Sequence, residues 1–341
     1  MSPGPRRRRA GGAAFRTHPA PSRPRGGGGF LPGFPMTPLL LVEQGLNGLQ
    51  LGVMLFLLAA GLTLVFGVMD MINLAHGSFY MVGAYLTATF ARLTGSFLLG
   101  LLIALPTAAL IGMAVEVVAL RSLYRRDHLD QVLGTFGLIL FFNEAVRMIW
   151  GPTPLFLDPP PWLAGQIELW PGLGYPAYRF AILVVGLATA LFLWLFIGRT
   201  RTGMRIRAGA SNRAMAGALG IDIDRLFTLV FGLGVALAAL AGAMAGPILA
   251  VQVGMGENIL ILTFVVIVIG GIGSVKGAFV AALLVGLCDT LARTVLPVLL
   301  RLALPPATAD GLGGAVASMA IYILMAAVLV WRPRGLFPAH G

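Results

Sequence analysis

The chain has 341 residues, of which 58% are hydrophobic and only 11% are charged. Soluble domains carry about 25% charged residues, so this composition excludes a protein whose whole surface faces water. The net charge of +11 could indicate binding to nucleic acid, but seven of the arginines precede Met36. The others lie between apolar runs, as the orientation signals of membrane proteins do, so we expect contact with membrane lipid and no nucleic-acid partner.

Residues 1–35 are rich in Arg, Pro and Gly and contain no Asp or Glu. Such a segment cannot bury enough apolar surface to fold, so we expect a disordered leader. The short apolar run after Arg9 is interrupted by Arg16, so the segment lacks the core of a signal peptide. We hypothesise that translation starts at Met36, which mass spectrometry of the N-terminus would test.

Beyond Met36 the chain contains about nine long apolar runs, within a range of eight to ten. A helix needs about 20 apolar residues to cross a bilayer, and one soluble protein of this size could not hold so many in its core. The sequence therefore predicts an all-α, polytopic transmembrane helical bundle, with residues 36–338 as a single domain. The runs lie at 44–67, 74–92, 97–119, 131–150, 178–198, 225–249, 257–275, 277–298 and 312–331.

Clustered arginines predict the orientation. They occur in Arg121–Arg126, in Arg199–Arg213 and in the tail at Arg332 and Arg334, and the positive-inside rule places all three segments in the cytoplasm. Residues 151–178 contain no Lys or Arg and are rich in Pro and Trp, so we expect a periplasmic loop. Nine passes with a cytoplasmic C-terminus would put the N-terminus outside, in conflict with a cytoplasmic arginine-rich leader, unless one pass is broken or re-entrant. The predicted location is a bacterial inner membrane.

Two segments predict broken or re-entrant helices. Phe66–Gly77 and Val268–Gly277 each place glycines and ionisable groups between apolar stretches. Irregular backbone at membrane depth is tolerated only inside protein or beside water. Paired interruptions in the two halves of a chain are typical of a transport pathway built on an internal inverted repeat. An internal inverted repeat is therefore a hypothesis for this chain.

The sequence offers little for enzyme chemistry. Residues Gly270–Lys276 resemble a phosphate loop only superficially, because Val275 stands before Lys276 where such a loop has Gly. No histidines are spaced as metal ligands and no nucleophile elbow is present, so we expect no catalytic residue, no metal site and no bound cofactor. Energy for transport would then come from a partner or an ion gradient.

Several ionisable residues lie within or beside the apolar runs, where charges are costly and often functional. Asp70 and His76 flank the first break, so a functional role and a structural role both stay open for them. Two pairs, Glu144 with Arg147 and Asp289 with Arg293, are spaced to neutralise each other on one helix face. Glu116 is a further ionisable residue within an apolar run.

The connection at residues 200–224 is the most informative loop. Basic residues come first, then a helix-compatible stretch at Asn212–Leu219, and then Gly220 as a C-terminal cap. A helix this short is hard to stabilise alone, so it suits docking into a groove of a soluble partner.

Four motifs occur in order between Leu40 and Phe337. With these motifs the chain resembles the permeases of branched-chain amino-acid ABC importers, in particular the half of that family that carries Asn-Leu-Ala-His-Gly. One departure is Lys276, which stands where a Pro or another small or polar residue is expected. The motifs are Asn47–Tyr85 containing Asn73-Leu-Ala-His-Gly77, Arg199–Asp222 containing Ala216-xxx-Gly220-Ile221-Asp222, Gly270-Gly-Ile-Gly-Ser274-xx-Gly277, and Arg332-Pro-Arg-Gly-Leu-Phe337.

The resemblance implies an importer with a second related permease, two cytoplasmic ATPases that bind the ATP, and a periplasmic substrate-binding protein. Branched-chain amino acids are the implied substrates, with urea or short-chain amides as the alternative. The implied translocation pathway comprises Asn73, His76, Gly77, Gly271, Ser274 and Lys276. The implied ATPase-coupling loop comprises Arg205, Arg207, Ala216, Gly220, Ile221 and Asp222.

Two other functions compete with this one. A secondary transporter driven by H⁺ or Na⁺ would use Asp70 and His76 as a proton relay, and its uptake would persist without ATP. An intramembrane enzyme would need a nucleophile beside a base, which the sequence does not assemble.

Overall fold

The computed structural model describes residues 38–124 and 126–337, so the predicted leader lies outside the described residues. The described chain is mostly helical. Seven of its helical segments are long and apolar enough to cross a membrane. They are α1 (Pro38–Met69), α3 (Phe97–Val115) continued by a π-helical turn (Glu116–Leu120) and a 3₁₀ turn (Arg121–Leu123), α4 (His128–Trp150), α5 (Ala177–Arg199), α8 (Ile223–Ala245), α10 (Val275–Leu300) and α11 (Pro306–Trp331).

The remaining helices are shorter or more polar. α2 (His76–Thr94) and α9 (Met255–Gly270) each lie beside one of the two predicted breaks, and α6 (Arg201–Ser211) and α7 (Arg213–Ala218) form the arginine-rich connection. Each of the nine predicted apolar runs therefore coincides with one helix, and the predicted transmembrane helical bundle is confirmed.

The connection between α4 and α5 contains structure that the sequence analysis did not predict. Strands β1 (Gln166–Trp170) and β2 (Leu173–Pro176) form an antiparallel hairpin, preceded by a short 3₁₀ turn (Pro161–Leu163). The turn between the strands contains Gly172, whose φ of 88° favours glycine because it lacks a Cβ. The Pro-rich composition of this connection obscured the short alternating stretch that forms β1.

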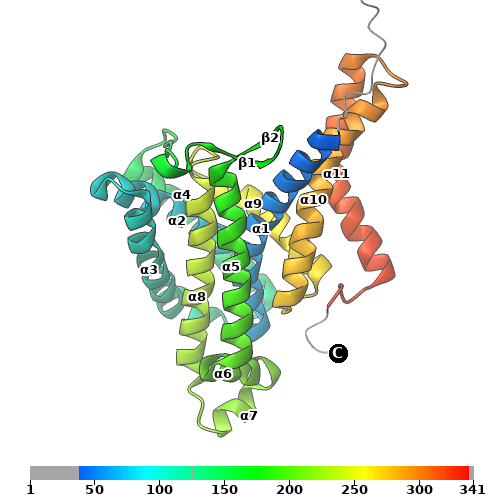
Figure 1. The fold of residues 1–341 in the computed structure, drawn as a ribbon. Coiled ribbons are helices and arrows are strands. Elements are labelled where there is room, and N and C mark those ends of the chain that lie inside the picture. Colours follow the sequence, from blue (N-terminus) through cyan, green and yellow to red (C-terminus); the bar gives the residue numbers. More distant parts are fainter. Residues whose placement is uncertain (1–37, 125, 338–341) are drawn as a thin grey trace, which may run out of the picture. The chain divides into compact units, whose positions relative to one another are not determined.

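Helix α1 lies at the centre of the bundle (Figure 1). All its residues from Val53 to Val65 are buried, which fits a helix that is apolar on every face. It packs mainly against α10, α8 and α5. Gly52 allows the close approach to α10, because a Cβ there would lie 2.7 Å from the carbonyl oxygen of Ala282. Helix α2 packs mainly on α3 and α8, and also meets α9, whereas it touches α1 only slightly.

The first predicted break is confirmed between Met69 and His76. Asp70 ends α1 with a φ of 50°, in the left-handed region, which Asp tolerates better than most residues. Its N–H still donates to the carbonyl of Phe66, at 2.8 Å. The chain then makes a short turn before α2 begins.

The second predicted break is confirmed between Gly270 and Val275. Gly271 and Gly273 have φ values of 100° and 82°, which only glycine adopts readily. Ser274 then caps α10, because its Oγ accepts a hydrogen bond of 3.1 Å from the N–H of Gly277. The chain therefore makes a sharp turn at this break, so that α10 packs beside α9.

Both predicted ion pairs within helices are confirmed. Arg147 lies 2.7 Å from Glu144, and Arg293 lies 2.8 Å from Asp289. These pairs explain the four charges in apolar runs without a functional role.

Candidate functional site

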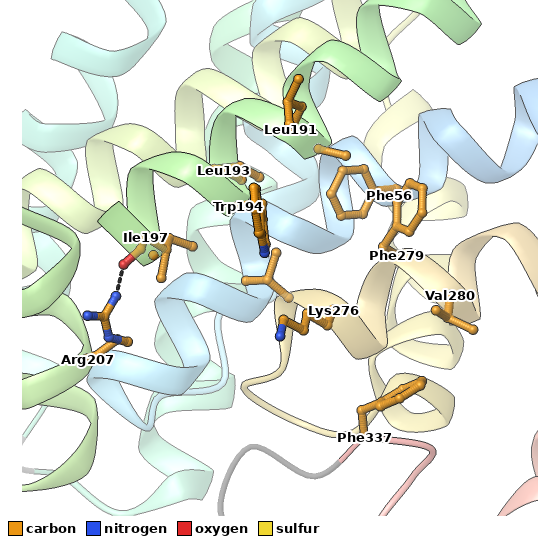
Figure 2. Close-up of a pocket in the computed structure, with 13 residues that line it drawn as sticks. Phe56, Leu191, Leu193, Trp194, Ile197, Arg207, Lys276, Phe279, Val280 and Phe337 are labelled. Carbon is orange, nitrogen blue, oxygen red and sulfur yellow. Dashed lines mark hydrogen bonds between the residues drawn. The ribbon is translucent and has the colours of Figure 1, made fainter. Parts of the chain in front are cut away.

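A cavity of about 670 Å³ lies between α1, α5 and α10. Its wall is mostly apolar and aromatic (Figure 2). Phe56 from α1 and Phe279 from α10 pack edge to face, with ring centroids 5.0 Å apart. Helix α5 adds Trp194, and the C-terminal tail adds Phe337. The cavity can therefore accept an apolar group of moderate size.

A smaller cavity of about 340 Å³ adjoins the first, since Ile197, Arg207, Val275 and Lys276 line both. Its wall is more polar. The additional lining residues include Thr63 and Gly67 of α1, and Gly273 and Ser274 of the second break. The break that the sequence predicted thus forms part of this wall.

Two basic side chains face these cavities. Lys276 is exposed and stands in the first turn of α10, and Arg207 is exposed on α6. Arg207 donates a hydrogen bond to the carbonyl of Ile197 near the end of α5. Among the described residues that line the two cavities there is no Asp or Glu. The described residues also contain no group of three or more His, Cys, Asp or Glu side chains that could hold a metal ion.

The structure brings together only two of the six predicted pathway residues, Ser274 and Lys276. Asn73 and His76 are fully buried and line neither cavity. The His76 ring packs against α1, where a Cβ added at Gly61 would lie 2.9 Å from its Nε2. The side-chain nitrogen and oxygen atoms of Asn73 and His76 have no hydrogen-bond partner in the described part of the chain.

The two predicted pathway glycines lie at packing contacts. Gly77 meets α9, since a Cβ there would lie 2.5 Å from the carbonyl oxygen of Gly256. Gly271 meets the C-terminal tail, where a Cβ would lie 2.8 Å from the carbonyl oxygen of Phe337. The same tail is held by the N–H groups of Leu336 and Phe337, which donate to the carbonyls at the end of α9.

The sequence analysis missed the residues of α1 and α5 that line the cavities. Phe56, Thr63 and Trp194 lie in apolar runs where each looks like an ordinary packing residue. Only the juxtaposition of α1, α5 and α10 marks them, and no local pattern could have found them.

The arginine-rich connection forms two short helices, α6 and α7, beyond the end of α5 (Figure 1). Thr200 caps α6 and Asn212 caps α7, each by accepting a hydrogen bond from the N–H three residues later. Gly220, with a φ of 85°, follows α7, and the N–H of Ile221 reaches back to the carbonyl of Ala216 at 3.1 Å. The predicted short helix and its glycine cap are confirmed.

An outer hollow of about 690 Å³ lies between α6, the turn after α7 and the start of α8. Four of the six predicted coupling residues line it: Arg205, Gly220, Ile221 and Asp222. Asp222 also caps α8 and forms an ion pair of 2.9 Å with Arg225. Ala216 is buried and holds α7 in place. Arg207, in contrast, lines the inner cavities and not this hollow.

A buried carboxylate ties the end of α3 to α8 close to this hollow. Glu116 is fully buried, and its oxygens accept hydrogen bonds from Arg121, from the Thr228 hydroxyl at 2.7 Å and from the Tyr124 hydroxyl at 2.9 Å. Burial and the neighbouring carboxylate raise the pKa of the Tyr124 phenol, so it stays protonated and donates. Glu116 is the first residue of the π-helical turn Glu116–Leu120, and its carboxylate reaches Thr228 of α8.

We expect Glu116→Ala to destabilise the protein by about 2–3 kcal/mol, because the Tyr124 hydroxyl would lose its acceptor and Arg121 its ion pair, although the Thr228 hydroxyl can still donate to the Asp224 carbonyl at 3.0 Å. Arg121 is 36% exposed and can be solvated, which limits the loss. The midpoint of thermal unfolding in detergent measures the effect. Glu144→Ala is the control, since its exposed ion pair should contribute less than about 1 kcal/mol. Equal melting temperatures for the two variants would contradict the role of the network.

Residues 45–329 match the family described as branched-chain amino acid transport system / permease component. The permease protein LivH of the high-affinity branched-chain amino acid transport system of Escherichia coli K12 is 31% identical over 277 residues, covering 76% of this chain and 88% of LivH. The corresponding protein BraD of Pseudomonas aeruginosa PAO1 is 31% identical over 313 residues, covering 86% of this chain and 95% of BraD.

The E. coli K12 permease protein LivM of the same kind of system is 28% identical over 332 residues, covering 88% of this chain and 72% of LivM. No solved structure matches the chain significantly. The apolar helices and these relatives identify an integral membrane protein. The chain belongs to the family of permease components of branched-chain amino acid transport systems.

Proposed function

We propose that this chain is the transmembrane permease subunit of an ATP-binding-cassette importer, which moves branched-chain amino acids from a periplasmic binding protein into the cytoplasm. The observation that carries the proposal is the cavity between α1, α5 and α10. It combines an apolar, aromatic wall with basic side chains at one side, as an amino acid with a branched apolar side chain requires.

The lining favours this substrate over urea or a short-chain amide. Urea has no apolar surface to bury, and its polar groups need several hydrogen-bond partners. The larger cavity offers Phe56, Trp194 and Phe279 instead, and its volume of about 670 Å³ exceeds what urea would fill. A leucine or isoleucine side chain would bury apolar area there, which is favourable by about 25 cal/mol per Å².

We further propose that the larger cavity is this chain's half of the translocation pathway and that a second related permease completes it. The hollow lined by Arg205 and Asp222 would receive one of two cytoplasmic ATPases, which bind the ATP. This assignment places α6, α7 and the C-terminus in the cytoplasm of a cell with an inner membrane. The positive-inside rule supports it, because the arginines gather in this connection and in the tail.

Reconstitution of the complete transporter in proteoliposomes tests the proposal. With the binding protein loaded and ATP inside, we expect uptake of L-leucine, L-isoleucine and L-valine that stops when ATP is omitted. Uptake should resist a protonophore, since the proton relay of a secondary transporter plays no part. Uptake that persists without ATP and collapses with the protonophore would overturn the proposal, and uptake of urea alone would overturn the substrate.

A further inference from the structure

Lys276 is the only lysine in the chain, which has 24 basic residues in all. It stands in the first turn of α10, at the junction of the two cavities. A positive side chain in the first turn of a helix is unfavourable, because the helix dipole is also positive there. Arg207 adds a second positive charge to the same two cavities.

No carboxylate of the described lining offsets these charges. Three sources of positive potential, Lys276, Arg207 and the N-terminus of α10, therefore act on one small volume. Such a volume favours an anion, and a carboxylate can accept hydrogen bonds from both basic side chains.

An unpartnered hydroxyl lies in the same wall. Thr63 lines the smaller cavity, is fully buried, and its Oγ1 has no hydrogen-bond partner among the described residues. Buried polar groups nearly always have a partner, and Thr63 is the one unpartnered side chain among the described residues that also lines this cavity, so its hydroxyl is available to a group that enters there. Thr63 is fully buried in α1 and lies less than two turns before the helix ends at Met69.

We propose that Lys276, Arg207 and Thr63 bind the carboxylate of the transported amino acid, while its side chain occupies the larger cavity between Phe56 and Trp194. The inference rests on the proposed function and adds the group of the substrate that this chain recognises. The headgroup of an anionic lipid offers similar chemistry, but it would have to leave the membrane surface to reach the buried Thr63 hydroxyl. Binding has to be weak, because the substrate must leave toward the cytoplasm.

The single lysine permits a direct test. The complete transporter, in nanodiscs of phosphatidylcholine, is treated with an amine-acetylating reagent, and acetylation of the Lys276 peptide is measured by mass spectrometry. We expect 4-methylpentanoate, which carries the carboxylate of leucine but no amine that would consume the reagent, to slow acetylation. 4-Methylpentanamide, which lacks the carboxylate and also has no amine, should give little protection. Nanodiscs with phosphatidylglycerol form a parallel arm for the lipid headgroup.

Each outcome decides the proposal. Equal protection by 4-methylpentanoate and 4-methylpentanamide, no protection in a preparation that transports leucine once it is reconstituted in proteoliposomes, or a Lys276 that never reacts would each overturn the carboxylate site. Protection by phosphatidylglycerol alone would assign the site to lipid. A preparation that shows protection by 4-methylpentanoate in nanodiscs but no ATP-dependent uptake of leucine in proteoliposomes would overturn the proposed function and leave the binding site standing.

Binding of radiolabelled L-leucine to variants of the same complex gives a second readout. Lys276→Gln should weaken binding about tenfold, as loss of a charge-assisted hydrogen bond does, and Lys276→Arg should restore most of it. Thr63→Val, which keeps the shape of the side chain, should weaken binding about threefold to tenfold. Unchanged binding in both Lys276→Gln and Thr63→Val would overturn the proposal even if protection were seen.

Discussion

Replacing Arg205 by glutamate is expected to abolish association with the ATPase subunits, whereas replacing Arg207 by glutamate should leave association intact and impair transport. The two residues lie on one helix, α6, two positions apart. Successive residues of an α-helix are separated by about 100°, so these two side chains point to nearly opposite sides. Arg205 lines the outer hollow, and Arg207 lines the inner cavities.

The physical reason differs for the two variants. A glutamate at 205 would reverse one charge of a basic surface that also contains Arg201 and Arg225, and the like charges that would then face each other across the interface with the ATPase should lower affinity more than about tenfold. A glutamate at 207 would place a negative charge where the substrate carboxylate is proposed to pass, and would remove the bond to the Ile197 carbonyl. Uptake should then fall by about tenfold or more.

Co-purification of the ATPase with tagged permease measures the first effect, and ATP-dependent uptake measures the second. Arg92→Glu is the control, since Arg92 lies in the last turn of α2 and lines neither the hollow nor the cavities. Size-exclusion profiles show whether each variant remains folded. Loss of ATPase with both variants, or with neither, would contradict the division of roles between Arg205 and Arg207.

This division shows what the sequence could and could not predict. The cluster of arginines identified the connection, and Asn212 and Gly220 marked the ends of α7, because capping depends on residues close in sequence. Which basic residue faces inward depends on how α6 packs against α5 and α8. That packing is tertiary, so Arg205 and Arg207 looked equivalent in the sequence.

The same distinction holds for the helices and the cavities. Long apolar runs predict membrane helices because length and hydropathy are local properties, and glycines beside ionisable residues predicted both breaks. The cavity wall joins Phe56, Trp194 and Phe279, which are far apart in the chain and lie on three helices. Asn73 and His76 carried the family motif, yet they lie buried away from the cavities, so a recognisable motif did not locate the cavity.

Gly77→Ala and Gly256→Ala are expected to prevent stable folding of the membrane domain. The two glycines face each other where α2 meets α9. A Cβ at Gly256 would lie 2.0 Å from the carbonyl oxygen of Gly77, and a Cβ at Gly77 would lie 2.5 Å from that of Gly256. Both obstacles are backbone atoms, so neither can be relieved by a change of rotamer, and the helices would have to separate.

Separation of α2 from α9 would expose buried groups next to the first break, including His76 and Asn73, which already lack hydrogen-bond partners among the described residues. We expect the free energy of unfolding to fall by about 3 kcal/mol or more. This is a large part of the roughly 5–15 kcal/mol that stabilises a typical folded domain. The fraction of monodisperse protein after detergent extraction, and its melting temperature, measure this loss. Gly137→Ala is the matched control, because Gly137 is also helical but has nothing within 4 Å of an added Cβ.

The Gly137→Ala control should fold normally and gain slightly in stability, since alanine favours a helix by about 1 kcal/mol over glycine. The comparison also decides between two roles for Gly77, which the sequence analysis placed in the translocation pathway. A Gly77→Ala variant that folds with a normal melting temperature but no longer transports leucine would favour the pathway role. A variant that fails to fold, in parallel with Gly256→Ala, would assign Gly77 to the contact between α2 and α9, because the same backbone collision accounts for both losses.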